Sequence, residues 1–129
     1  MNPLLDLASA LITVFEGERL TAYQDSGGVW TIGIGHTGPD VTPDLKITHE
    51  LSMALFAKDQ AQLLGLVAGM PLLKAAAMAS FGHNCGKHAL LKVIAGEDTM
   101  SNPIHTTDRH GTVQPGLVAR RRLEILLAG

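Results

Sequence analysis

The stretch Phe15–Gly38, FEGERLTAYQDSGGVWTIGIGHTG, decides the fold because the spacing of apolar residues changes within it. Before this stretch, apolar residues recur at three- and four-residue intervals from Leu4 onward, which predicts a helix that ends at Gly17. Inside it, the runs LTAYQ and VWTIGI flank the turn-forming residues DSGG, and this pattern predicts a β-hairpin. The sequence therefore places Glu16 at a helix end and Asp25 in the turn of the hairpin that follows.

Capping residues and prolines divide the rest of the chain. Asn2 is suited to cap the first helix, and Thr48 to cap a long amphipathic helix over 49–67. Prolines between positions 39 and 43 predict a loop, and we expect a third short strand near Leu45–Ile47. Further helices are expected over 71–83, 88–95 and 115–128, with a polar segment between the last two.

This order of elements predicts an α+β fold, in which a long helix joins a small antiparallel β lobe to a mostly helical lobe. A chain of 129 residues, 46% of them hydrophobic, suits one domain with a single core. We expect a single domain over 1–129, with the β lobe at about 18–48 and the helical lobe at about 49–129 together with the N-terminal helix.

Charge and cysteine content narrow the function classes. The formal net charge is −2, so the chain lacks the basic excess that predicts a nucleic-acid partner. Eight of the twelve acidic side chains fall in residues 1–60, which favours carboxylate chemistry there. Cys85 is the only cysteine, so no intrachain disulfide can form, and folding in a reducing cytoplasm is the simpler expectation. No apolar run approaches the ~20 residues of a membrane span.

Two motifs suggest a nucleotide site and a metal site, but the residues around them do not fit either kind of site. Gly33–Gly38 matches the dinucleotide pattern GxGxxG, but prolines follow it where the helix that holds the pyrophosphate should begin. His83, Cys85 and His88 lie close in sequence without the spacing of a zinc site. A nucleophilic role for Cys85 would require a general base, and no local motif supplies one, although a base distant in the sequence stays open. We therefore expect no metal and no cofactor.

Glu16 and Asp25 occupy opposed local environments. The field at a helix C-terminus disfavours a negative carboxylate at Glu16. A turn rich in Ser and Gly offers backbone N–H groups to an ionised Asp25. Two carboxyl groups in different environments are the pattern of glycoside hydrolysis, although a Glu at a helix end and an Asp in a turn are also ordinary solvated residues.

The whole stretch resembles the active-site segment of the phage-type lysozymes, or endolysins, of glycoside hydrolase family 24. In that family a Glu is followed after eight residues by an Asp and after five more by a Thr, and Glu16, Asp25 and Thr31 match this spacing without a gap. The flanking patterns EGxRLxAY and WTIGxGHxG match as well. The resemblance implies a lysozyme-like fold and an N-acetylmuramidase that cleaves the β-1,4 bond between N-acetylmuramic acid and N-acetylglucosamine in peptidoglycan.

The resemblance also implies roles for these three residues. Glu16 would be the general acid that protonates the leaving oxygen. Asp25 would stabilise the oxocarbenium-like transition state or act as a base, and Thr31 would position the attacking water.

Residues outside this triad are also candidates for the site. Arg120 or Arg121 resembles the family arginine that pairs with the catalytic Glu, and the sequence leaves open which one does so. Tyr23 and His36 flank the catalytic positions and are candidates for substrate contact, while packing in the sheet and orientation of the glycine-rich bend stay equally open. Family members usually have a longer helical stretch where this chain has the short polar segment 97–113.

The resemblance further implies a monomer that acts on peptidoglycan strands, without nucleic acid or stable membrane insertion. It would wait in the host cytoplasm and reach the periplasm and cell wall after the membrane is permeabilised. The alternatives are a lysozyme-like domain that binds peptidoglycan without cutting it, and a domain that keeps only the fold. The three catalytic positions favour the enzyme.

Overall fold

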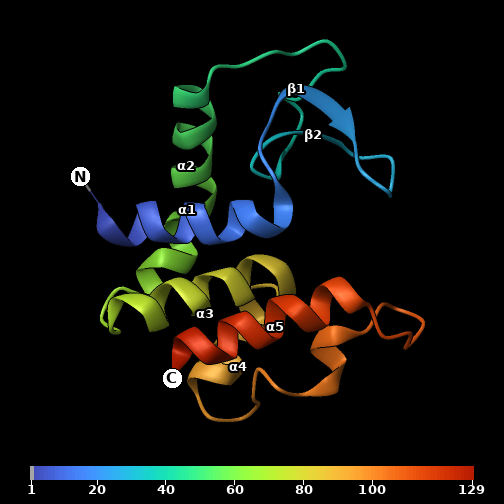
Figure 1. Cartoon of the computed structure of the whole chain (residues 1–129). Coiled ribbons are helices and arrows are strands. Elements are labelled where there is room, and N and C mark those ends of the chain that lie inside the picture. The colour runs from blue at the N-terminus through green and yellow to red at the C-terminus, as the bar shows by residue number, and fades with distance from the viewer. Residues whose placement is uncertain (1) are drawn as a thin grey trace. The chain divides into compact units, whose positions relative to one another are not determined.

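The structure is a computed structural model that describes residues 2–129, and it divides into two compact units. Residues 9–62 form the first, here called the β unit. Residues 2–8 and 63–129 form the second, here called the helical unit. The elements in chain order are α1 (Pro3–Glu16), β1 (Arg19–Gln24), β2 (Trp30–Gly33), β3 (His36–Thr37), α2 (His49–Val67), α3 (Leu72–Cys85), α4 (Lys87–Ile94), the 3-10 helix η1 (Pro103–Thr106) and α5 (Pro115–Ala128) (Figure 1).

Capping side chains define the ends of α1 and α2 as the sequence predicts. The Leu5 N–H donates to Asn2 Oδ1 at 3.1 Å, and the Leu51 N–H donates to Thr48 Oγ1 at 3.1 Å. At the other end of α1, Gly17 adopts a φ of 73° and donates its N–H to Thr13 O at 2.8 Å. Glu16 is therefore the last residue of a helix with a fixed end.

The predicted hairpin is formed by β1 and β2, and β3 pairs with β2 to complete a three-stranded antiparallel sheet of order β1-β2-β3 in the β unit. Ala22, Ile32 and Val41 are buried at its centre. Trp30, Leu45, Ile47 and Leu55 pack against them and are partly buried. This small core holds β2, which carries Thr31, between the other two strands.

The expected third strand near Leu45–Ile47 is wrong in position. The third strand of the sheet is β3, which is separated from β2 by only two residues because Gly33 and Gly35 adopt φ values of 65° and 74° and reverse the chain tightly. Residues 45–47 instead follow the outer edge of β1, where Lys46 makes only an isolated bridge with Thr21.

Helix α3 forms the centre of the helical unit, and it is buried from Ala75 to Gly82. The apolar character of this segment on nearly every side predicts this burial. A side chain at Gly82 would come within 2.8 Å of Leu90 Cδ2, so the glycine allows α4 to pack closely on α3. The core comprises Ala8, Val67, Ala75, Met78, Ala79, Phe81, Leu90 and Met100.

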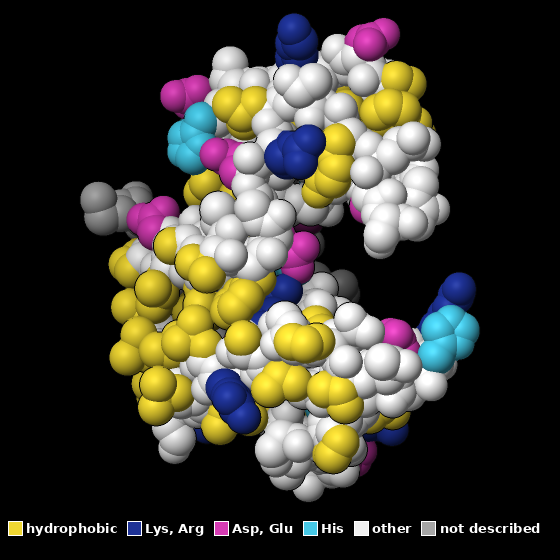
Figure 2. Space-filling model, turned by 45° about the vertical axis from the view of Figure 1, so that its right-hand side comes forward, with side chains coloured by type: hydrophobic (Ala, Val, Ile, Leu, Met, Phe, Trp, Pro, Cys, Tyr) yellow, Lys and Arg dark blue, Asp and Glu magenta, His cyan; other side chains and the backbone are white. Residues whose placement is uncertain are grey.

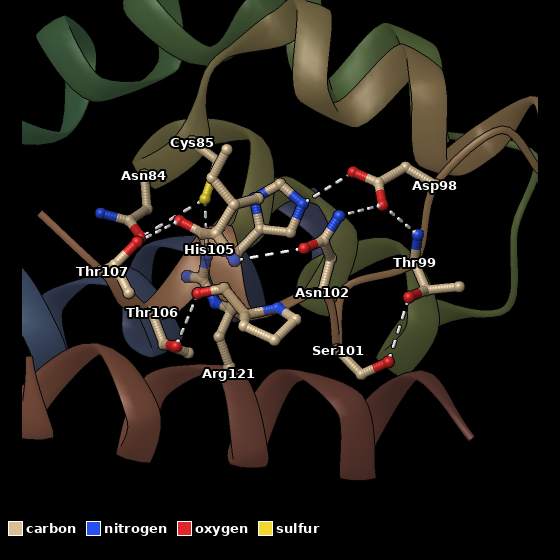
Figure 3. A network of polar contacts seen from close by, with 12 residues as sticks. Asn84, Cys85, Asp98, Thr99, Ser101, Asn102, His105, Thr106, Thr107 and Arg121 are labelled. Atoms are coloured by element: carbon tan, nitrogen blue, oxygen red, sulfur yellow. Dashed lines mark hydrogen bonds and ion pairs between the residues drawn. The ribbon is translucent and has the colours of Figure 1, made fainter. Parts of the chain in front are cut away.

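Asp98 organises the polar segment that precedes α5 (Figure 3). Its carboxylate accepts hydrogen bonds from the Thr99 N–H at 2.8 Å and from Asn102 Nδ2 at 2.9 Å, and it pairs with His105 Nε2 at 2.9 Å. These contacts, led by the Asn102 bond, lower the pKa of Asp98 to about 2. The His105 ring also meets the buried Phe81 ring edge-on, with centroids 4.8 Å apart. A short polar segment is thereby tied to the helical core.

Hydrophobic side chains are numerous on the surface of the helical unit (Figure 2). Single exposed apolar side chains are normal on globular proteins, so they assign no partner, and the expected monomer stays a prediction. Within residues 2–129, no helix is both long and apolar enough to cross a membrane. The exposed large hydrophobic residues of this unit are Leu72, Leu73, Leu91, Ile94, Ile104, Val113, Ile125 and Leu126.

Candidate active site

The three residues of the Glu-x8-Asp-x5-Thr pattern all belong to the β unit. Glu16 is the exposed last residue of α1. Asp25 is exposed and directly follows β1. Thr31 lies within β2 and is only 4% exposed. Of the three, Asp25 and Thr31 are joined through one short turn.

A turn over Asp25–Val29 holds the Asp25 carboxylate in place. Asp25 Oδ1 accepts hydrogen bonds from the N–H groups of Gly27 at 2.8 Å and Val29 at 2.9 Å. Two backbone bonds close the turn, from the Asp25 N–H to Val29 O and from the Gly28 N–H to Asp25 O, both at 2.9 Å. Among residues 2–129, no hydrogen bond reaches Asp25 Oδ2. One carboxylate oxygen is thus held by the backbone and the other is open to solvent.

The Thr31 hydroxyl has a defined orientation. Thr31 Oγ1 donates its hydrogen to Val29 O at 2.9 Å. A hydroxyl has a single hydrogen and two acceptor lone pairs, so this bond leaves Thr31 as an acceptor toward any further group. A water beside it would donate one hydrogen to Thr31.

Tyr23 lies beside Thr31 in the sheet. The register of β1 and β2 places Tyr23 opposite Thr31, so their side chains share one face of the sheet. The Arg19 guanidinium lies 4.4 Å from the centroid of the Tyr23 ring. The half-buried ring therefore supports the strand that carries Thr31, and a contact with sugar stays a prediction.

His36 is held between two carboxylates of the β unit. Its Nδ1 lies 2.6 Å from Asp59 Oδ2 of α2, and its Nε2 lies 2.9 Å from Asp40 Oδ2. Burial lowers the pKa of His36, but the hydrogen bonds and charges of Asp59 and Asp40 outweigh burial and leave the pKa raised above 6.5. The side chain is only 11% exposed, so this geometry supports a role in orienting the glycine-rich bend.

The His36 contacts should stabilise the fold in a pH-dependent way. Because the folded-state pKa is raised, the stabilisation is complete below about pH 6.5 and is lost as the pH rises through the folded-state pKa. We expect His36→Asn to lower the melting temperature by about 3 °C more at pH 5.5 than at pH 9. Thermal unfolding at both pH values measures the difference.

His49 offers a matched control for this measurement. It pairs with Glu18 at 2.9 Å, but its side chain is 62% exposed, so solvent screens the pair. His49→Asn should therefore lose little stability at either pH. Equal losses for His36→Asn at pH 5.5 and pH 9 would contradict the assignment of a charged His36 in the folded protein.

Arg120 and Arg121 belong to a buried ionic cluster of the helical unit, here called the Glu124 cluster and made of Ser80, Arg120, Arg121 and Glu124. Arg121 Nε lies 2.7 Å from Glu124 Oε1, and Arg120 Nε donates to Glu124 Oε2 at 3.2 Å. Ser80 Oγ also donates to Glu124 Oε2. Burial raises the pKa of Glu124, and the two guanidiniums oppose this effect. A pairing of either arginine with Glu16 stays a prediction.

Cys85 contacts Arg121 of this cluster, which lies 36 residues away in sequence. An Arg121 guanidinium nitrogen lies 2.6 Å from Cys85 Sγ, and the thiol donates to Asn84 Oδ1 at 3.6 Å (Figure 3). Burial raises the pKa of the Cys85 thiol, which favours its unreactive protonated form. In the described part of the chain, no three His, Cys, Asp or Glu side chains gather as a metal site would require.

The fold and this site agree with the protein family that the sequence matches. A sequence model of the family described as Phage lysozyme matches residues 13–124, and the chain therefore belongs to the phage lysozyme family. The endolysin of Salmonella phage P22 is 50% identical over 48 residues, which are 34% of this chain and 33% of that protein. This match thus spans about a third of the length of that curated relative.

Solved structures match over nearly the whole chain. The endolysin from Escherichia coli O157:H7 phage FAHEc1 superposes with a TM-score of 0.74 at 26% identity, covering 95% of this chain and 90% of that one. The muramidase domain of SpmX from Asticaccaulis excentricus gives a TM-score of 0.74 at 26% identity, covering 94% of this chain and 93% of that one. These likenesses confirm the predicted lysozyme-like α+β fold.

Proposed function

We propose that the protein is an endolysin, an N-acetylmuramidase that hydrolyses the β-1,4 bond between N-acetylmuramic acid and N-acetylglucosamine in peptidoglycan. The observation that carries the proposal is the Asp25–Thr31 arrangement in a member of the phage lysozyme family. Asp25 has one oxygen held and one open, and the Thr31 hydroxyl is oriented as an acceptor. Such a pair is suited to hold a water molecule between them.

Each site residue has a role in this proposal. Glu16, on the rigid end of α1, protonates the oxygen that leaves the scissile bond. Asp25 accepts a proton from the attacking water and stabilises the positive charge that develops on the sugar. Thr31 positions that water. Arg120 or Arg121 serves as the arginine partner of Glu16.

Thr31 leads to a stereochemical prediction. A nucleophilic Asp requires the two carboxyl groups roughly 5 Å apart, whereas an inverting site requires roughly 6.5–9.5 Å to admit a water. A neutral hydroxyl beside Asp25 helps mainly the second arrangement, so we expect inversion. Proton NMR should detect the α-anomer as the first product, before mutarotation. A β-anomer appearing first, or a glycosyl adduct trapped on Asp25, would refute the water-positioning role of Thr31.

A wall-clearing assay tests the proposal against a domain that only binds. The protein is incubated with purified peptidoglycan, and turbidity and soluble reducing ends are followed over time. An active muramidase lowers the turbidity and releases reducing ends. A binding module would sediment with the walls and leave them intact, and a domain that keeps only the fold would stay in the supernatant.

The cellular setting belongs to the same proposal. The partner is the peptidoglycan glycan strand, and the protein acts as a monomer without nucleic acid or stable membrane insertion. It accumulates in the host cytoplasm and reaches the periplasm and cell wall once the membrane is permeabilised. Fractionation of host cells before and after permeabilisation tests this route, because the protein should move from the cytoplasmic to the periplasmic fraction.

A further inference from the structure

We propose that the Val29 peptide group, held in place by Gly28, is the positioning element that couples Asp25 to Thr31. This inference rests on the proposed muramidase function. The Val29 N–H donates to Asp25 Oδ1 at 2.9 Å, while Val29 O accepts the Thr31 hydroxyl at 2.9 Å. Val29 O also accepts the Asp25 N–H at 2.9 Å, which closes the turn. One residue's backbone therefore orients both groups that face the water.

Gly28 sets the direction of this peptide group. It adopts a φ of +80°, in the left-handed region that L side chains rarely occupy. A Cβ at Gly28 would meet no atom within 4 Å, so the requirement for glycine is conformational rather than steric. A side chain there would favour a different φ and turn the Val29 N–H away from Asp25.

The chain contains a second turn with the same backbone design, at 108–112. Asp108 Oδ1 accepts from the N–H groups of His110 at 2.8 Å and Thr112 at 3.0 Å, as Asp25 Oδ1 does from residues at the same two positions. The Asp108 N–H donates to Thr112 O at 2.9 Å, and the Gly111 N–H donates to Asp108 O at 3.0 Å. Gly111 has a φ of +78°, and its Cβ position is equally open.

The two turns differ at the second carboxylate oxygen. Six residues after Asp108, Gln114 Nε2 donates to Asp108 Oδ2 at 3.0 Å, so both oxygens of that carboxylate accept hydrogen bonds. Six residues after Asp25, Thr31 donates its hydroxyl hydrogen to Val29 O instead. Asp25 Oδ2 therefore stays open. The comparison separates the structural design, which both turns share, from the open oxygen, which only the Asp25 turn provides.

The open oxygen assigns the direction of proton transfer. A water donates one hydrogen bond to Asp25 Oδ2 and the other to Thr31 Oγ1, and its oxygen faces the anomeric carbon. As the water oxygen bonds to that carbon, the bond to the glycosidic oxygen breaks, Glu16 gives its proton to the leaving oxygen, and the water proton passes to Asp25 Oδ2. Both atoms and charge balance in this step.

Gly28→Ala and Gly111→Ala form a matched pair that tests the proposal. Each substitution strains a turn of the same backbone design, so the melting temperature should fall by similar amounts. With a soluble peptidoglycan oligosaccharide, Gly28→Ala should lower kcat by at least about tenfold and leave KM nearly unchanged, because the misplaced water affects only the chemical step. Gly111→Ala should keep kcat within about twofold of the original protein. Gly28→Asn should recover most of the lost kcat, because Asn tolerates a positive φ.

A second pair keeps the test decisive if Gly28→Ala does not fold. Val29→Pro removes the N–H that donates to Asp25, and Thr112→Pro removes its counterpart in the other turn. The proposal predicts a loss of kcat for Val29→Pro alone. Equal kcat for both members of either folded pair would overturn the positioning role while the original protein still clears walls. Failure of the original protein to cleave any substrate would instead overturn the proposed function.

Discussion

Replacing Glu16 with Gln is expected to lower turnover of peptidoglycan by about 10³-fold and to leave the fold intact. General acid catalysis contributes roughly 10²- to 10⁴-fold, and the glutamine amide cannot donate the required proton to the leaving oxygen. Glu16 is exposed at the end of α1, where the Gly17 cap rather than its own side chain ends the helix, so stability should change little. Release of reducing ends and thermal unfolding measure the two effects.

Glu18→Gln is the control for this experiment. Glu18 is a carboxylate two residues further along, and it pairs with His49 instead of lying in the catalytic pattern. It should retain most of the turnover. Comparable turnover in Glu16→Gln and the original protein would show that Glu16 is not the general acid.

Breaking the Glu124 cluster should have the largest effect on stability. The side chain of Glu124 is fully buried, and those of Arg120 and Arg121 are each only 3% exposed. Glu124→Ala removes the buried carboxylate that both guanidiniums contact, and breaking a buried ion pair by removing one partner typically costs about 3–5 kcal/mol of unfolding free energy. Urea denaturation of the original and variant proteins measures this difference.

Arg122→Ala is the control in the same helix. Arg122 is exposed, so its replacement should change the free energy of unfolding by no more than about 0.5 kcal/mol. A loss below about 1 kcal/mol for Glu124→Ala would mean that water or other groups compensate the two arginines in the variant, and that the cluster is not essential for stability.

Local sequence patterns predicted the elements that carry the candidate site. Helical spacing and the Gly17 cap placed Glu16 at the end of α1, and the DSGG turn placed Asp25 after β1. These features depend on neighbouring residues, so their signals lie within one short window. The third strand was misplaced because the tight reversal at Gly33 and Gly35 brings the chain back to β2 before the expected position.

Contacts between distant residues escaped prediction. Asp59 lies 23 residues from His36, and Ser80 lies 44 residues from Glu124, so no spacing rule relates them. The turn at 108–112 did have a local signal, an Asp followed three residues later by Gly, as at Asp25. The other residues of the two turns differ, so only the hydrogen bonds show that the turns share one backbone design.

End-group analysis of the digestion products tests the muramidase assignment most directly. Purified peptidoglycan is digested, the new reducing ends are converted to sugar alcohols with borohydride, and mass spectrometry identifies the terminal sugar, with Glu16→Gln as the blank. Cleavage of the proposed bond predicts reduced N-acetylmuramic acid at every new end. Reduced N-acetylglucosamine, or no new ends beyond those of the blank, would contradict the account.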